Sequence, residues 1–365
     1  MGRQSRKLAK RRADAEAEAA AAPPATSTSH SPPAKKQKLS SGLNNWEAEK
    51  LFGEITSKLK NYPRVSQPLP RRLKIGTRSL KDKDPSLLTW TCNKCRRINY
   101  PRRYLLTDLP VIQCECGEEA DIEFDFSMAN IEVNGECPIG NVKNQQKEPK
   151  CTVYSTASNI EATLRMRQIL SGQKLEDNKP VININQLVDH YEFLRINYGI
   201  NQKPEDQWNY KTIRSLFIAL GLFGAVTEEP SVHELGDYVR VNKNFYDICR
   251  VLADGHPLTT GIVPGKKFRH LKPGQIYKAP KKEKFTANKK DTGHAILLIG
   301  AGRRRKTNYY HFLNSWGENF CLTDDGKGGF GMVRASDITL RPLKFIRYKE
   351  EVVHHQSLAS TYKAQ

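Results

Sequence analysis

The stretch that decides the fold is Lys143-Asn144-Gln145-Gln146-Lys147-Glu148-Pro149-Lys150-Cys151, which runs directly into a predicted helix. Apolar residues recur there at helical spacing, at Val153, Ala157, Ile160 and Leu164. This spacing predicts one buried helix face, and Ser171-Gly172 ends the run. Cys151 is therefore expected at a helix N-terminus, where the dipole and free amide groups favour the thiolate before any partner acts. A small buried hydrophobe is the alternative reading of such a cysteine.

Two further motifs lie far downstream, at Gly293-His294-Ala295 and Asn314-Ser315-Trp316-Gly317. Residues 295–299 read as a buried strand, residues 303–308 as a polar turn and residues 309–313 as a returning strand. Such a hairpin would bring His294 and Asn314 close together. A thiol needs a base to ionise it and a group to orient that base, and these two residues supply candidates for both roles. A histidine at the start of a strand is otherwise usually structural.

These motifs carry a resemblance to the papain-like cysteine peptidases over residues 127–345. The matching residues are Lys143-Asn144-Gln145, Cys151, Ile160-Glu161, Phe268, Gly274-Gln275-Ile276-Tyr277, Gly293-His294-Ala295, Asn314-Ser315-Trp316-Gly317 and Gly329-Phe330-Gly331. The resemblance implies an α+β, two-lobed papain-like fold, in which a helical lobe carries the cysteine and a β-rich lobe carries the histidine and asparagine.

The resemblance also implies a role for each site residue and a cysteine-type endopeptidase activity. Cys151 would be the nucleophile, His294 would hold the proton as an imidazolium, and Asn314 would orient the imidazole. Gln145 would supply its amide to the oxyanion beside the backbone N–H of Cys151. Substrate contacts would fall to Ala295, which matches a specificity-pocket residue, and to Trp316, which would cover the hydrogen bond between histidine and asparagine. No cofactor is expected for catalysis.

Several positions depart from the family pattern. Thr152 stands where the family has a tryptophan, and Glu148 replaces a cysteine that the family uses in a disulfide. The family's paired-glycine substrate loop is missing around residues 206–210, and residues 1–126 contain no recognisable inhibitory pro-segment. These differences concern substrate binding and control more than the chemical step.

A second group of cysteines is formed by Cys92, Cys95, Cys114 and Cys116, with eighteen residues between the two pairs. Two close thiolate pairs across a hairpin-length loop suit tetrahedral zinc, so the sequence predicts a zinc-ribbon-like module with one structural zinc. Four unrelated buried thiols are the alternative. The intervening loop contains basic and aromatic residues, which suit nucleic-acid binding. A ribbon that only braces its neighbour would suit them equally well.

The eight cysteines leave an odd set outside the zinc and catalytic groups, which favours a reducing compartment. The net charge of +20 is concentrated in residues 1–110, which hold 24 Lys/Arg against 9 Asp/Glu. This surplus indicates an acidic partner such as nucleic acid, or a targeting tail. The run Pro32-Pro33-Ala34-Lys35-Lys36-Gln37-Lys38-Leu39 suits an import receptor and predicts a nuclear location. No apolar run reaches the ~18 residues of a membrane span, and no secretory leader is expected.

The sequence as a whole predicts five segments. Residues 1–44 would form a disordered basic tail and residues 45–87 a short helix with a Pro/Arg-rich connector. The zinc-ribbon-like module would span residues 88–126, the peptidase domain residues 127–345 and a second tail residues 346–365. The predicted function is hydrolysis of peptide or isopeptide bonds in polypeptide substrates. The alternative is a catalytically weak binding module that the basic zinc segment recruits to nucleic acid or to protein partners.

Overall fold

The structure is a computed structural model that describes most of the chain between residues 88 and 345. It describes residues 54, 57, 59, 61–62, 64–65, 88–175, 179–198, 210–235, 238–280 and 293–345. All of these belong to one compact unit, Ser41–Gln365. The predicted tails at residues 1–44 and 346–365 lie outside the described residues. So does most of the predicted helix near residue 50, of which residues 54, 57 and 59 are helical.

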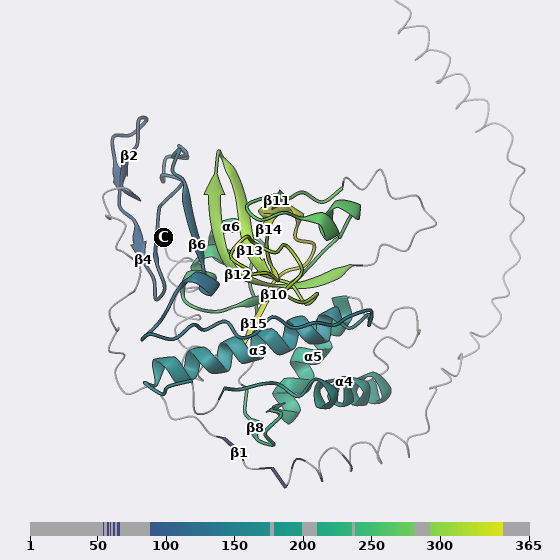
Figure 1. The fold of residues 1–365 in the computed structure, drawn as a ribbon. Coiled ribbons are helices and arrows are strands. Elements are labelled where there is room, and N and C mark those ends of the chain that lie inside the picture. The colour runs from purple at the N-terminus through teal and green to yellow at the C-terminus, as the bar shows by residue number, and fades with distance from the viewer. Residues whose placement is uncertain are drawn as a thin grey trace, which may run out of the picture. The chain divides into compact units, whose positions relative to one another are not determined.

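Three long helices lie together on one side of a large sheet (Figure 1). They are α3 (Cys151–Leu170), α4 (Ile184–Tyr198) and α5 (Tyr210–Phe223). A fourth helix, α6 (Phe245–Ala253), packs against strand β12 (His294–Arg304) of the sheet. None of the helices that the structure describes combines the length and apolar character of a membrane span.

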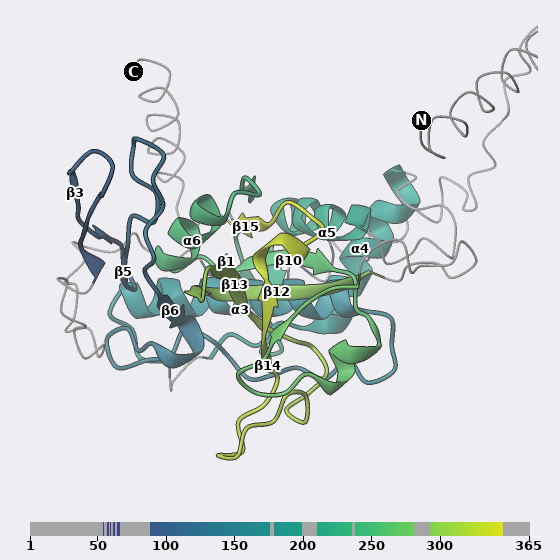
Figure 2. The ribbon, with the colours of Figure 1, turned by 90° about the horizontal axis from the view of Figure 1, so that it is seen from above.

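The large sheet has eight strands among the described residues. Its main path runs β11 (Ile276–Tyr277), β14 (Phe330–Arg334), β13 (Thr307–Leu313), β12, β10 (Leu258–Ile262), β15 (Leu343–Phe345) and β9 (Tyr238–Arg240). Strand β6 (Phe124–Ser127) also pairs with β12, where β12 extends past β10. In the view from above, β12 crosses the middle of this sheet (Figure 2).

Smaller strands complete the described part of the chain. The short strands β1 (Arg64–Val65), β8 (Val232–His233) and β7 (Ala225–Val226) form a three-stranded sheet beside α4. Two ribbons lie near β6, namely β2 (Trp90–Thr91) with β3 (Ile98–Asn99), and β4 (Arg102–Arg103) with β5 (Asp108–Leu109). Three 3-10 turns, η2 (Met128–Asn130), η4 (Lys266–His270) and η6 (Ala335–Asp337), connect these elements.

The hairpin predicted around residues 295–313 is present, with longer strands and a tighter turn than expected. β12 continues to Arg304 and β13 begins at Thr307, so the expected polar turn over residues 303–308 shrinks to Arg305 and Lys306. Both turn residues have positive φ, 47° and 60°. A two-residue loop with this backbone follows the right-handed twist of the flanking strands, which explains why the ladder extends so far.

Helix α3 is buried on nearly all sides, whereas the sequence predicted one buried face. The four apolar positions are buried as predicted, but so are polar residues such as Thr156 and Asn159. The helix lies between the sheet and the pair of helices α4 and α5. Its polar residues are therefore buried as well, because little of the helix faces solvent. The Asn159 amide donates to Thr259 Oγ1 at 2.9 Å and so ties α3 to β10.

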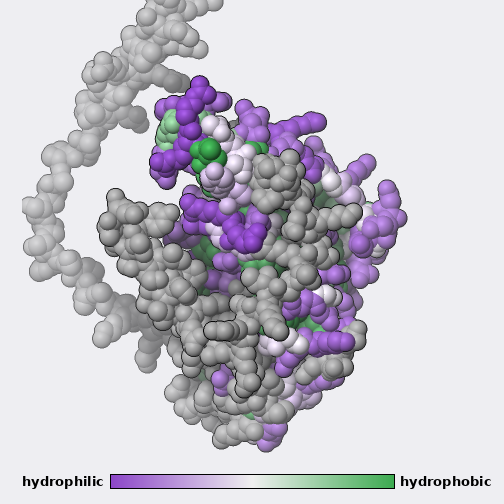
Figure 3. Space-filling model, turned by 90° about the vertical axis from the view of Figure 1, so that its left-hand side faces the viewer, coloured by the Kyte–Doolittle hydropathy of each residue, from purple (hydrophilic) through white to green (hydrophobic). Residues whose placement is uncertain are grey.

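The segment over residues 88–123 packs against the large sheet and α6. Leu106 and Leu109 belong to the same hydrophobic core as the sheet residues. The backbone N–H of Leu106 donates to Ala253 O at 2.8 Å, and Glu119 forms an ion pair with the buried Arg303 at 3.3 Å. Figure 3 views the molecule from the side on which this segment lies, and the side chains that are coloured there are mostly hydrophilic, with small hydrophobic areas between them. This segment therefore shares its core with the sheet that carries His294.

Candidate active site

Cys151, His294 and Asn314 converge where the start of α3 meets the first residue of β12. Cys151 is the first residue of α3, and its thiol is 7% exposed. The backbone N–H of Ala295 donates to Cys151 Sγ at 3.5 Å, so the thiol lies against the residue that follows His294. Asn314 comes directly after β13, so the hairpin brings it beside His294 as predicted.

The hydrogen bonds of Asn314 define the tautomer of His294. Asn314 Oδ1 accepts the backbone N–H of Ser315 at 2.9 Å, which fixes the orientation of the amide. His294 Nε2 lies 2.7 Å from the same oxygen, so Nε2 must carry the proton and donate it. The neutral ring therefore has its lone pair on Nδ1, which is the state that can take a proton from a thiol.

Aromatic rings enclose the imidazole. The Trp316 ring lies 4.7 Å from the His294 ring, centroid to centroid, and the Phe268 ring lies 5.7 Å from it edge-on. His294 is 5% exposed. Because water is largely excluded, the hydrogen bond to Asn314 is stronger here than it would be at the surface. Trp316 thus lies against the imidazole, next to which the resemblance placed it.

Burial sets the protonation preferences of the two reacting groups. It lowers the pKa of the His294 imidazole to about 4, and the hydrogen bond to Asn314 acts in the opposite direction. It also raises the pKa of the Cys151 thiol, although backbone N–H groups of Ala295 and Thr152 favour the thiolate. The amide groups at the helix start thus favour the thiolate as predicted, but loss of hydration outweighs them and the pKa is raised overall. A thiolate in this site depends on attraction to an imidazolium.

The Gln145 segment is held by a short strand-like pairing with the residues that follow Asn314. The backbone N–H of Gln145 donates to Ser315 O at 2.8 Å, and the N–H of Gly317 donates to Lys143 O at 3.0 Å. The Ser315 hydroxyl donates to Gln145 Oε1 at 2.5 Å, and Gln145 Nε2 donates one hydrogen to Glu148 O at 2.7 Å. A primary amide has two N–H groups, so the bond to Glu148 uses one of the two. Ser315 was not predicted, although its place between Asn314 and Trp316 was a usable signal.

A buried ion pair connects the Gln145 segment to α3. Lys143 Nζ lies 2.7 Å from Glu161 Oε1, and the backbone N–H of Ile182 donates to the same oxygen at 2.7 Å. Burial raises the pKa of Glu161, while the lysine charge and both hydrogen bonds lower it. Lys143 and Glu161 both belong to the motifs that match the family, but the sequence did not predict that they form an ion pair.

Ala295 lies directly behind the thiol. It is 3% exposed and belongs to the same hydrophobic core as Cys151. It pairs with Gly261 across β10 and β12, where a Cβ on Gly261 would come within 2.7 Å of the Leu340 side chain.

The four cysteines predicted as metal ligands lie close together at the tip of the β2 and β3 ribbon. Their sulfur atoms all lie within 4.8 Å of one another, with 3.4 Å between Cys92 and Cys116 and 3.5 Å between Cys95 and Cys114. Tetrahedral zinc with Zn–S bonds of about 2.3 Å requires sulfur atoms about 3.8 Å apart. The donor set and its spacing therefore fit a zinc ion, and none of the eight cysteines forms a disulfide.

Comparisons with known proteins identify the family of this chain. Residues 129–339 match the papain family of cysteine proteases. The cathepsin B-like cysteine proteinase 3 of Ostertagia ostertagi is 32% identical over 95 residues, which are 26% of this chain and 48% of that protein. The chain thus matches about half the length of this curated relative.

Two solved structures are also similar, both digestive procathepsins from the Tenebrio molitor larval midgut. Procathepsin L 3 has a TM-score of 0.41 at 14% identity, over 57% of this chain and 66% of that one. Procathepsin L2 has a TM-score of 0.43 at 16% identity, over 63% and 70%. The family match spans more than half of the chain and contains Cys151, His294 and Asn314. The chain therefore belongs to the papain family of cysteine proteases and has a papain-like fold of helices and sheet.

Proposed function

We propose that the chain hydrolyses peptide bonds through an acyl-enzyme on Cys151. The observation that carries this proposal is the hydrogen bond from His294 Nε2 to Asn314 Oδ1, which leaves Nδ1 of a buried imidazole free to act as the base. The residue after His294, Ala295, donates its backbone N–H to the Cys151 thiol, which supports a pairing of this imidazole with Cys151.

In the first half of the reaction, the Cys151 sulfur attacks the carbonyl carbon of the scissile bond. The thiol proton passes to His294, and the carbonyl oxygen becomes an oxyanion. The backbone N–H of Cys151 and the second N–H of Gln145 would donate to that oxygen. When the C–N bond breaks, His294 returns the proton to the amine, which leaves an acyl thioester on Cys151.

In the second half, water replaces the amine. His294 removes a proton from the water molecule, whose oxygen attacks the thioester carbonyl. Collapse of the second oxyanion breaks the C–S bond, releases the carboxylic acid and restores the thiol and the neutral imidazole. An isopeptide substrate would differ only in its amine, so the same steps would serve both bonds.

The role of Gln145 gives a direct test. The Gln145→Ala variant is expected to lower kcat/KM on fluorogenic peptides by about 10²–10³, the usual effect of removing an oxyanion donor. Alkylation of Cys151 by iodoacetamide should be little affected, because that reaction forms no oxyanion. A matched variant, Gln146→Ala, changes an exposed neighbour and should retain activity. Equal losses in both variants, or none in either, would contradict the assignment.

We further propose that Cys92, Cys95, Cys114 and Cys116 hold one structural zinc in a ribbon-like module over residues 88–126. Cys92 and Cys114 are buried, and backbone turns hold each pair, with Arg96 N–H donating to Cys92 O and Gly117 N–H to Cys114 O. Zinc would link the two turns and hold the ribbon together. The peptidase domain would begin near residue 127.

A second function, nucleic-acid binding by the zinc module, is favoured by its exposed side chains. Ile98 and Tyr100 are 50% and 66% exposed, and Arg102 and Arg103 follow them on an exposed strand. This is the combination that stacks bases and contacts phosphates. Fluorescence anisotropy with a single-stranded oligonucleotide tests it: Tyr100→Ala and Arg102→Ala should weaken binding. No binding at 50 mM salt would rule it out.

We also propose a nuclear location and recognition by an import receptor through Lys35, Lys36 and Lys38, on the basis of the lysine run next to prolines. Imaging of a fluorescent fusion in cells tests this proposal. Replacing the three lysines by alanine should move the protein to the cytoplasm. A nuclear signal that does not change would contradict the proposal.

A further inference from the structure

A row of cations lies next to the proposed reaction centre. The turn η4 (Lys266–His270) and the residues after it contribute four exposed basic side chains, Lys266, Lys267, Arg269 and Lys272, which we call the η4 basic surface. Residues 262–280 contain no aspartate or glutamate. None of these cations has a part in the acyl-transfer chemistry described above.

The η4 basic surface is tied to the imidazole through aromatic contacts. Phe268, in the middle of η4, is fully buried and lies 5.7 Å from the His294 ring and 5.2 Å from the Trp316 ring, centroid to centroid. Arg269 extends over the outer part of this group, with Cζ 5.6 Å from the Trp316 centroid. The ring that covers His294 is therefore itself in contact with a cation.

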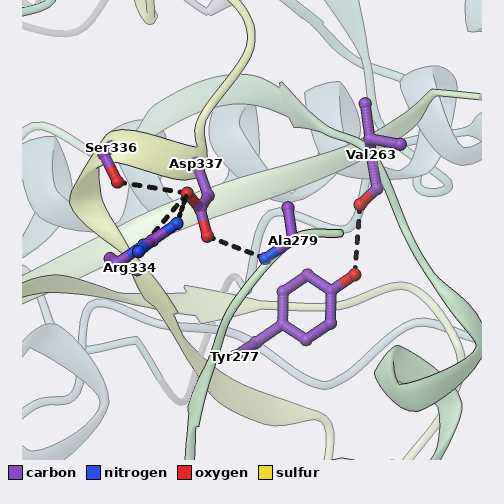
Figure 4. Close-up of polar contacts among 6 residues, drawn as sticks. All are labelled: Val263, Tyr277, Ala279, Arg334, Ser336 and Asp337. Atoms are coloured by element: carbon purple, nitrogen blue, oxygen red, sulfur yellow. Dashed lines mark hydrogen bonds and ion pairs between the residues drawn. The ribbon is translucent and has the colours of Figure 1, made fainter. Parts of the chain in front are cut away.

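Hydrogen bonds at both ends hold the segment in place (Figure 4). The Tyr277 hydroxyl donates to Val263 O at 3.1 Å and accepts the N–H of Gly265 at 2.6 Å. The N–H of Ala279 donates to Asp337 Oδ2 at 2.7 Å, and Arg334 holds the other oxygen of that carboxylate. The backbone that carries the cations is thus braced on β14 and η6, so little ordering is required when a substrate binds.

The position of His294 shows which part of a substrate meets this surface. The imidazole must deliver its proton to the nitrogen of the leaving amine, so the leaving portion of the substrate lies on the His294 side of the thiol. Trp316 and Phe268 of η4 both contact the His294 ring, so the η4 basic surface adjoins the group that meets the leaving portion. We propose that the η4 basic surface recognises acidic side chains in the leaving-group portion of a polypeptide substrate. This inference rests on the proposed peptidase function and names its substrate class.

The charge balance around Trp316 supports this preference. The acidic residues between Trp316 and β14 are Glu318, Asp324 and Asp325, and Asp325 pairs with Lys327 at 3.6 Å, whereas η4 and the residues directly after it carry four cations and no acidic residue. Exposed charges interact weakly one at a time, so each contact is expected to change kcat/KM by about two- to fivefold. Several contacts together should change kcat/KM about tenfold between acidic and basic leaving portions. This difference should decrease as added salt shortens the Debye length, which is ~10 Å at 0.1 M.

The experiment uses three quenched fluorogenic peptides that share one acyl portion and carry Asp-Asp, Asn-Asn or Lys-Lys in the leaving portion. With the full chain, kcat/KM is expected to fall in that order by about tenfold overall. The Lys266→Glu/Lys267→Glu variant should reduce or reverse the order. Arg269→Glu should have the same effect. Because this variant also removes the contact between Arg269 and the Trp316 ring, the lysine variant serves as an independent test of the charge effect. Lys243→Glu is the matched control, an exposed lysine before α6.

Binding to the Cys151→Ala protein separates this inference from the catalytic proposal. The same three peptides should bind with Kd values that rise from Asp-Asp to Lys-Lys, and the charge-reversal variants should remove the difference. This result needs no chemistry, so it would stand even if hydrolysis were absent. Equal kcat/KM values and equal Kd values for the three peptides would overturn the inference. A preference that charge reversal at η4 leaves unchanged would overturn it as well.

Discussion

Replacing Cys151 by alanine is expected to lower kcat/KM for peptide hydrolysis by roughly 10⁴ to 10⁶, the range found when a nucleophile of this kind is removed. Alanine has no sulfur atom and is smaller than cysteine, so it fits without overlap beside Ala295, and the small cavity that it leaves should lower the free energy of unfolding only slightly. The measurement is steady-state kinetics on fluorogenic peptides, with thermal unfolding of both proteins.

Cys321→Ala is the matched control for this loss. Cys321 is a half-buried thiol at the edge of the sheet core and has no part in the proposed chemistry. Its alanine variant should keep wild-type kcat/KM. Activity that survives in Cys151→Ala, or that disappears equally in the control, would show that Cys151 is not the nucleophile.

Removal of one zinc ligand is expected to have the second largest effect, on metal content and stability. Cys114→Ser should reduce bound zinc from about one ion per chain to nearly none, because binding of a structural zinc by four thiolates typically contributes about 10–16 kcal/mol. The consequence should extend beyond the ribbon. Leu106 and Leu109 lie in the sheet core, and Tyr246 of α6 is hydrogen-bonded to the Ile112 N–H.

Elemental analysis and hydrogen exchange measure both parts of this prediction. Faster exchange is expected in residues 88–123 and in α6, which they contact, and Cys321→Ser is the control for loss of a thiol alone. Zinc-free wild-type protein that keeps slow exchange over residues 88–126 would contradict a structural role. Unchanged zinc in Cys114→Ser would remove this cysteine from the ligand set.

The sequence predicted the elements whose signals are local. Alternating and apolar runs defined the hairpin of β12 and β13, and its closure necessarily placed His294 near Asn314. The apolar repeat defined α3 with Cys151 at its first residue. The role of Gln145 came from the resemblance to the papain-like peptidases and not from a local signal.

Other features depended on contacts between distant segments and could not be predicted. Periodicity assigned one buried face to α3 because it cannot show that the helix lies between two layers. For the same reason the sequence did not predict how burial raises the pKa of the Cys151 thiol. The pairing of β6 with β12, and the Glu119–Arg303 ion pair beside it, likewise join segments that are far apart in the chain.

Direct capture of the acyl-enzyme tests the central claim most sharply. The protein is mixed with a slowly deacylating ester, quenched in acid, and analysed by intact mass and peptide mapping. We expect one acyl group per chain, located on Cys151, and a much slower appearance of this adduct in His294→Ala. An acyl group on another cysteine, or the same rate of acylation with and without His294, would contradict it.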